Sequence, residues 1–119
     1  MNLKKTYTAL LTADLPAAEG WYTKLLGRGP DYRPMNTLVQ WELFDEGGLM
    51  LSTSAEIAGR GVMFVYVDDV AAERRRLQRV GILLGDNIEG DYSTLAQVRD
   101  PDGNLLTVAT LPSRAFPPA

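Results

Sequence analysis

The side chains that most often carry chemistry at neutral pH are missing from this sequence, which contains no histidine and no cysteine. Without histidine, the commonest general base and the commonest metal ligand are absent. Without cysteine, there is no thiol nucleophile, no thiolate metal site and no disulfide. Any catalytic or binding chemistry must therefore use carboxylates, phenols, hydroxyls or lysines.

The carboxylates form no acid–base pair that their spacing identifies. Glu42 falls in a predicted strand, and Glu89 and Asp91 fall in a predicted loop. A lone carboxylate can act as a base when burial raises its pKa. Because nothing in the spacing singles out one of the three, we expect all of them to be solvated surface groups.

Length and composition indicate one small globular domain. A chain of 119 residues that is 45% hydrophobic can bury one core but is too short for two independent ones. A net charge of −3 and an isoelectric point of about 4.8 argue against nucleic acid and anionic membranes as partners. No stretch approaches the roughly 20 apolar residues of a membrane span, and no cleavage site follows the short apolar start. We expect a cytoplasmic protein.

Hydrophobic periodicity, helix caps and turn residues divide the chain into alternating elements. The elements predicted in the first half are a strand at 7–12, a helix from Asp14 to Gly27, a loop at 28–36, a strand at 37–44, a hairpin turn at 45–48 and a strand at 49–53. Those predicted in the second half are a strand at 62–67, a helix at 71–80 after Asp69, a strand at 82–84, a loop at 85–91, a strand at 93–99, a turn at 100–103 and a strand at 104–110.

The two halves resemble each other. Residues 17–19 and 71–73 both read Ala-Ala-Glu, and Gly27 then falls on Gly81. Two strand–helix units can look alike by chance, but the agreement of order, spacing and turn chemistry favours a true repeat. We predict a single α+β domain over 1–119. It consists of two tandem βαβββ modules, at about 5–55 and 61–111, that form a curled mixed sheet with helices on the outer face, and a flexible tail at 112–119.

Several motifs resemble those of the vicinal-oxygen-chelate superfamily, which includes glyoxalases, bleomycin resistance proteins and extradiol dioxygenases. Asp14-Leu15, followed by Trp21-Tyr22 and Leu25-Leu26-Gly27, is similar to the first strand–helix junction and helix of that superfamily. The run from Asp100 to Asn104, Asp-Pro-Asp-Gly-Asn, is similar to its closing hairpin and is the most specific match. The resemblance extends over nearly the whole chain, to about Thr110.

The resemblance implies four metal-ligand positions, and this sequence places no usual metal ligand at any of them. Tyr7 and Val62 stand where the superfamily has histidines, and Thr107 stands where it has a final glutamate. The remaining position falls at Met50 or Leu51. Divalent metals require imidazole, carboxylate or thiolate ligands. We therefore expect no metal and no cofactor.

The resemblance also implies that these positions face a concave pocket. Because side chains alternate along a strand, Phe64 and Tyr66 share the face of Val62. A mostly apolar pocket with a few polar groups is typical of a small-molecule site, although the same residues could fill an ordinary core. The predicted ligand-binding residues are Tyr7, Trp41, Val62, Phe64, Tyr66 and Thr107, with Trp41 as an aromatic wall.

The leading hypothesis is a metal-independent binding protein of the glyoxalase/bleomycin-resistance type that sequesters a small aromatic or antibiotic-like molecule and thereby confers antibiotic resistance. One alternative is a cofactorless lyase, isomerase or dioxygenase-like enzyme that uses Tyr7, Tyr66 or a loop carboxylate. A metal-dependent enzyme of the same superfamily and a scaffold module without a ligand are further alternatives. We expect a homodimer, because the chain has little core and the resembled proteins commonly pair so that both chains line each pocket.

Overall fold

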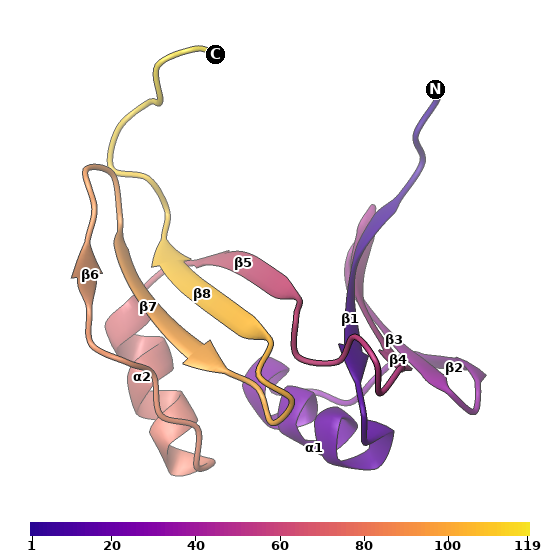
Figure 1. Ribbon diagram of the computed structural model, residues 1–119. Helices are drawn as coiled ribbons and strands as arrows, with labels where there is room; N and C mark the ends of the chain where they lie inside the picture. Colours follow the sequence, from indigo (N-terminus) through magenta and orange to yellow (C-terminus); the bar gives the residue numbers. More distant parts are fainter. The chain divides into compact units, whose positions relative to one another are not determined.

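The computed structural model describes residues 1–119 as two helices and eight strands (Figure 1). In chain order they are β1 (Thr6–Thr12), α1 (Leu15–Leu26), β2 (Tyr32–Met35), β3 (Leu38–Phe44), β4 (Gly47–Thr53), β5 (Val62–Val67), α2 (Val70–Arg79), β6 (Ile88–Glu89), β7 (Thr94–Arg99) and β8 (Leu105–Thr110). The order is βαβββ twice. The predicted α+β fold of two βαβββ modules is therefore confirmed.

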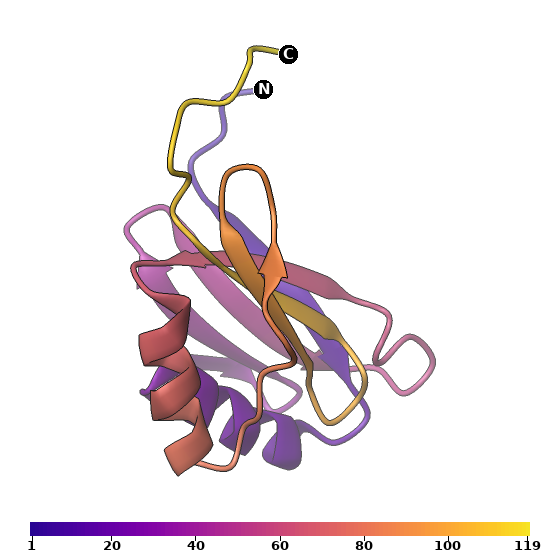
Figure 2. The same cartoon turned by 90° about the vertical axis from the view of Figure 1, so that its left-hand side faces the viewer.

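Each module forms its own four-stranded sheet, and the two sheets have the same strand order. The first runs β1-β4-β3-β2 and the second β5-β8-β7-β6. The first sheet is mixed, because β1 pairs with β4 in parallel while β3 pairs with both β4 and β2 in antiparallel fashion. Figure 2 shows the short β6–β7 hairpin of the second module in orange.

The chain divides into two compact units, Met1–Met63 with Arg99–Leu105 and Phe64–Val98 with Leu106–Ala119. The turn between β7 and β8 thus belongs to the first unit, and hydrogen bonds explain why. Asp102 accepts from the backbone N–H of Ala13 at 2.9 Å. The Asn104 side chain accepts from the N–H of Gly61 at 2.8 Å and donates to the carbonyl of Leu11 at 3.1 Å. The Asp100–Asn104 run, which is the most specific match to the superfamily, therefore binds the turn between β7 and β8 to the rest of the first unit by hydrogen bonds. We call this run the clasp.

The core of the first unit lies between α1 and one face of its sheet. Alternate sheet residues are buried there together with the inner face of the helix: Leu10, Val39, Trp41, Leu49 and Leu51 with Leu15, Ala18, Tyr22 and Leu25. Asp14 caps α1 by accepting from Ala17, and Gly27 ends it in the left-handed conformation at φ 78°, as predicted. The buried Tyr22 hydroxyl donates to Asp100 at 2.7 Å, which ties the helix to the clasp.

In the second unit, α2 begins at the predicted cap, Asp69. Arg74 then anchors the helix to the segment after it, donating to the carbonyls of Leu84 and Gly85, both at 2.9 Å. The strand predicted at 82–84 is wrong. Ile82 and Leu84 are buried and Leu83 is exposed, as in a strand, but the segment pairs with no neighbouring strand. Alternating burial alone does not make a ladder of hydrogen bonds.

Three other boundaries differ from the prediction. The loop predicted at 28–36 contains β2, an exposed edge strand that tolerates Pro34 because no neighbour needs its missing N–H. The loop predicted at 85–91 contains the two residues of β6. The turn predicted at 45–48 is shorter, because Gly47 and Gly48 already belong to β4.

The segment after β8 has no regular structure, but it contacts the β6–β7 hairpin. The N–H of Ser113 donates to the carbonyl of Tyr92 at 2.8 Å. The Arg114 guanidinium lies 4.7 Å from the centre of the Tyr92 ring, and the Phe116 ring also lies 4.7 Å from it. Neither helix of the chain has the length and apolar character needed to cross a membrane.

Candidate functional site

The first sheet has a second face, turned away from α1, whose residues are half-buried or exposed. We call it the open face of the first sheet. It consists of Tyr7, Ala9 and Leu11 of β1, Gly48, Met50 and Ser52 of β4, and Leu38, Gln40 and Glu42 of β3. Polar groups gather at the end of this face where Tyr7, Gly48 and Glu42 lie.

Tyr7 and Glu42 form the central contact of the open face. The Tyr7 hydroxyl lies 2.8 Å from Oε1 and 2.7 Å from Oε2 of Glu42. Since β4 lies between β1 and β3, this hydrogen bond crosses the middle strand. The residue opposite Tyr7 on β4 is Gly48, which has no side chain to stand between the phenol and the carboxylate.

One further donor and one cation lie beside the Glu42 carboxylate. The Gln40 side-chain amide donates to Oε1 at 2.7 Å, and the Lys5 ammonium lies 4.0 Å from Oε2. The hydrogen bonds from Tyr7 and Gln40 hold the pKa of Glu42 below its ordinary value. The hydrogen bond from Tyr7 to Glu42 also raises the pKa of Tyr7, and burial raises it further. At neutral pH the pair is therefore a carboxylate and a neutral phenol.

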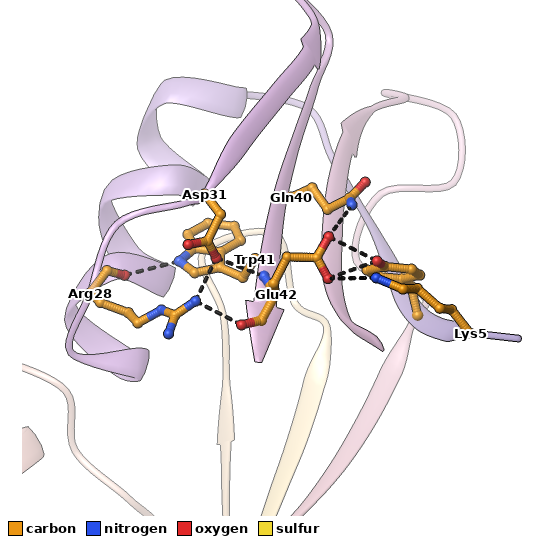
Figure 3. A network of polar contacts seen from close by, with 7 residues as sticks. Lys5, Arg28, Asp31, Gln40, Trp41 and Glu42 are labelled. Atoms are coloured by element: carbon orange, nitrogen blue, oxygen red, sulfur yellow. Dashed lines mark hydrogen bonds and ion pairs between the residues drawn. The ribbon is translucent and has the colours of Figure 1, made fainter. Parts of the chain in front are cut away.

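The loop between α1 and β2 fixes the backbone on either side of the Glu42 side chain (Figure 3). Asp31 accepts from the N–H of Glu42 at 2.7 Å, and Arg28 donates to the carbonyl of Glu42 at 2.7 Å while pairing with Asp31. The Trp41 indole N–H donates to the carbonyl of Arg28 at 2.9 Å. The hydrogen bond from the N–H of Glu42 and, to a smaller extent, the one from Arg28 hold the pKa of Asp31 below its ordinary value.

This loop supports β3 where its pairing with β4 becomes irregular, because the register shifts between Trp41 and Phe44. An irregular strand loses ladder hydrogen bonds, and Asp31 and Arg28 supply replacements for the backbone of Glu42. The loop thereby orients Glu42 toward Tyr7.

Two clefts adjoin this pair, both within the first unit. The larger, about 410 Å³, is lined by Lys5, Tyr32, Glu42, Leu43, Phe44 and Asp45. The smaller, about 310 Å³, is lined by Thr6, Tyr7, Thr8, Phe44, Glu46, Gly47 and Gly48. The Tyr7–Glu42 pair therefore has open space beside both of its members.

Among the predicted site residues of the first unit, only Tyr7 lies in this cluster. Trp41 has no exposed surface and packs on the α1 side of the sheet, with its ring 6.4 Å from that of Tyr22. It is a core residue on the face opposite Tyr7. Val62, at the start of β5, is 71% exposed.

The other predicted residues belong to the second unit. Phe64 and Tyr66 project from one face of β5, where they are 53% and 46% exposed, and their rings form an edge-to-face pair at 5.1 Å. Thr107 on β8 accepts a hydrogen bond from Gln97 on β7 at 3.1 Å. That all these residues share one concavity with Tyr7 stays a prediction.

The residues at the expected metal positions do not fit a divalent ion. The chain has no His and no Cys, so Asp and Glu are its candidate metal ligands. The structure brings no three of these side chains together in a group that could hold a metal ion. The carboxylate in contact with Tyr7 is that of Glu42, which already accepts hydrogen bonds from Tyr7 and Gln40. A single engaged carboxylate beside a neutral phenol is a poor donor set for such an ion.

The sequence interpretation missed Glu42, which we expected to be solvated. Its side chain is only 23% exposed. A signal was present, because Gln40 and Glu42 alternate with the apolar Val39 and Trp41 in a strand. The alternation places both polar residues on one face, but only the pairing of β1, β4 and β3 places that face beside Tyr7.

No protein-family model matches the chain, and no curated protein matches it. Solved structures do match over nearly its whole length. A glyoxalase/bleomycin resistance protein from Catenulispora acidiphila has a TM-score of 0.82 at 26% identity, over 93% of this chain and 100% of that one. Lactoylglutathione lyase from Agrobacterium tumefaciens has a TM-score of 0.73 at 25% identity, over 88% of this chain and 91% of that one.

A bleomycin-binding protein solved with bleomycin has a TM-score of 0.73 at 21% identity, over 89% of this chain and 97% of that one. These matches agree with the observed repeat of βαβββ modules and with the motifs of the sequence. The chain has the fold of the vicinal-oxygen-chelate superfamily, to which glyoxalases and bleomycin resistance proteins belong.

Proposed function

We propose that this protein binds a small, partly aromatic molecule without a metal, as a sequestering protein of the glyoxalase/bleomycin-resistance type. The observation that carries the proposal is the Tyr7–Glu42 pair. Tyr7 stands at the position where the resemblance implies the first metal-binding histidine, and Glu42 accepts its hydrogen bond. Clefts of about 410 and 310 Å³ adjoin the pair. A phenol and a carboxylate beside open space can orient a ligand by hydrogen bonds.

The protonation of the pair favours binding over catalysis. A general base works best when its pKa lies near the working pH. The hydrogen bonds from Tyr7 and Gln40 lower the pKa of Glu42, and the bond to Glu42 raises the pKa of Tyr7. Both shifts move away from neutrality. Glu42 is therefore a weak base and Tyr7 a weak acid, which argues against a cofactorless enzyme that uses this pair.

The matching structures support the same ligand class. One of them is a bleomycin-binding protein in complex with bleomycin, and another is described as a bleomycin resistance determinant, at 22% identity. We also propose that the protein is a cytoplasmic homodimer and that it sequesters an antibiotic-like molecule. Its net charge of −3 supports a small ligand over nucleic acid.

The test is ligand-induced stabilisation in the absence of metal. The purified protein is heated with bleomycin and with a panel of planar aromatic natural products, with and without a chelator. A ligand bound only by the folded state raises Tm. We expect at least one compound to raise Tm equally in both conditions. Tyr7→Phe should reduce this shift, whereas Tyr92→Phe, which changes a phenol outside both clefts, should not.

Stabilisation that disappears with the chelator and returns with a divalent metal would contradict the proposal. Turnover of the stabilising compound to a product would contradict it as well and would favour the enzyme.

A further inference from the structure

The larger cleft of the first unit combines a held carboxylate with exposed aromatic rings. Tyr32 and Phe44, which line it, are 60% and 72% exposed. The Glu42 carboxylate at its wall is only 23% exposed and keeps its charge, because Tyr7 and Gln40 lower its pKa. Asp45, in the turn after β3, lines the same cleft. Two acidic and two aromatic residues therefore line one space of about 410 Å³.

One cation of the chain already lies in this cleft, and it is loosely held. The Lys5 ammonium is 4.0 Å from Oε2 of Glu42, which is beyond hydrogen-bond distance, and the Lys5 side chain is 53% exposed. An exposed ion pair of this kind contributes little to stability. A carboxylate has about four acceptor positions, so Glu42 can accept a closer donor on the side that faces Lys5.

Aromatic faces attract cations as well. A cation over the face of Tyr or Phe is favoured by the ring's negative charge distribution, and an anion is not. The cleft therefore offers a cation a charged hydrogen-bond acceptor and aromatic surface together. It offers an anion only Lys5, and two acidic residues line the same cleft.

From these contacts we propose that the cleft binds an organic cation, an ammonium or guanidinium group carried on a small apolar or aromatic body. The cationic group donates to Oε2 of Glu42 in place of Lys5, and the body lies against Tyr32 and Phe44. This inference rests on the proposed function and narrows its ligand to a charge class. It assigns Glu42 the role of selecting that charge, and Lys5 the role of an internal competitor.

The test uses three probes of similar shape and different charge: benzylammonium, benzyl alcohol and benzoate. Binding is followed on the full chain by the chemical shifts of its backbone amides, and each probe is titrated to saturation. We expect benzylammonium to shift the amides of Glu42, Phe44 and Asp45 and to bind about tenfold more tightly than benzyl alcohol. Benzoate should bind more weakly than benzyl alcohol, and added salt should weaken only the binding of benzylammonium.

Variants separate this site from the overall charge. Glu42→Gln should reduce the affinity for benzylammonium about tenfold and that for benzyl alcohol by a smaller factor. Glu56→Gln, which removes the same charge from an exposed turn outside the cleft, should change neither. Lys5→Met should strengthen benzylammonium binding about twofold to fivefold. Asp45→Asn, in an exposed turn away from the Tyr7 contact, should weaken it by a smaller factor than Glu42→Gln.

Equal binding of benzylammonium and benzyl alcohol would overturn the inference, as would equal effects of Glu42→Gln and Glu56→Gln. If the charge preference is absent while bleomycin or an aromatic compound still raises Tm without metal, only this inference fails. If no compound raises Tm but benzylammonium binds at Glu42, the cation site stands and the sequestration proposal fails.

Discussion

Glu42 owes its properties to the donors around it more than to burial. The N–H of its own residue is held by Asp31, and its carboxylate accepts from Tyr7 and Gln40. Hydrogen bonds to the charged form lower a carboxyl pKa, whereas burial alone would raise it. Here the hydrogen bonds outweigh burial, so the side chain keeps its charge in a half-buried position. A charged group of this kind is suited to binding, because it can select a ligand by charge.

The first prediction concerns the Tyr7 phenol. Its pKa is raised above 10.0 because its proton is held by Glu42 and because ionisation would place two negative charges side by side. Glu42→Gln removes the charge, so the pKa of Tyr7 should fall toward 10. Titration of ring-labelled tyrosines by NMR measures it. Glu56→Gln should leave it unchanged, and an unaltered Tyr7 titration in Glu42→Gln would show that the two groups are not coupled.

The second prediction follows from the lowered pKa of Glu42. A carboxyl whose pKa is lower in the folded state binds fewer protons there than in the unfolded chain. Its contribution to stability is therefore present above its ordinary pKa of 4.5 and is lost as pH falls through the lower, folded value. In urea unfolding, the wild type should exceed Glu42→Gln in free energy of unfolding at pH 7, and the difference should shrink below pH 4.5. A constant difference would contradict the linkage.

At the scale of elements, β4 determines the site because it lies between the two strands that carry Tyr7 and Glu42. Gly48 is the residue of β4 opposite Tyr7. A Cβ added there would lie only 1.9 Å from the carbonyl oxygen of Trp41, so the irregular β3 backbone leaves no room for a side chain. The glycine allows both the close approach of β3 and the phenol–carboxylate contact above it.

The third prediction compares two glycines. Gly48→Ala should destabilise the protein by about 1–3 kcal/mol, because the new methyl group forces the β3 backbone to move. It should also lower the Tyr7 pKa, because Glu42 moves with that backbone. Gly20→Ala, in α1 with nothing within 4 Å of its added Cβ, should instead stabilise the protein by about 0.5–1 kcal/mol. Thermal and urea unfolding measure both, and equal stability of the two variants would contradict the packing argument.

The fourth prediction concerns the clasp between β7 and β8. Tyr22→Phe removes a buried donor from Asp100, which is only 5% exposed, so we expect a loss of about 1–3 kcal/mol. Asn104→Ala should cost more, since Asn104 contacts Gly61, Leu11 and Asp100 at once. Tyr66→Phe, at a 46% exposed phenol, should lie within about 0.5 kcal/mol of the wild type. Urea unfolding would refute the clasp if all three variants were equally stable.

Local signals predicted most of the elements. The caps at Asp14 and Asp69 and the apolar strand at 62–67 agree with the structure, because they depend on residues close in sequence. β2 and β6 were missed because they are short edge strands without apolar alternation. Such strands exist because a neighbour offers hydrogen bonds, and that information is not local.

The site was only half predictable for the same reason. The resemblance identified Tyr7, since its position is set by the opening motif. Glu42 could not be assigned, because its role depends on a parallel pairing of β1 with β4 and an antiparallel pairing of β4 with β3. Trp41 was considered as a pocket wall because a strand residue can face either side, and its neighbours Gln40 and Glu42 face the open side instead.

At the scale of the whole molecule, the two modules share a strand order but differ in the surfaces they expose. The first carries a phenol, a carboxylate and an amide on its open face. The second exposes Val62, Phe64 and Tyr66, which stand at every second position of β5. The two modules therefore share a strand order and differ in the side chains that they carry on their surfaces.

The last prediction is that the chain forms a homodimer. Three large apolar side chains at alternate positions of one strand, from 46% to 71% exposed, form an apolar strip that a two-fold partner can bury. Light scattering at micromolar concentration should give about 26 kDa, twice the 13.1 kDa of the chain. Phe64→Asp should shift the mass toward the monomer, because a charge on that strip opposes burial. Ile57→Asp, which adds the same charge to another exposed apolar residue in a turn outside β5, should not. A monomer mass for the wild type would refute the dimer. If Phe64→Asp and Ile57→Asp both gave the monomer mass, the effect would not be specific to the apolar strip of β5.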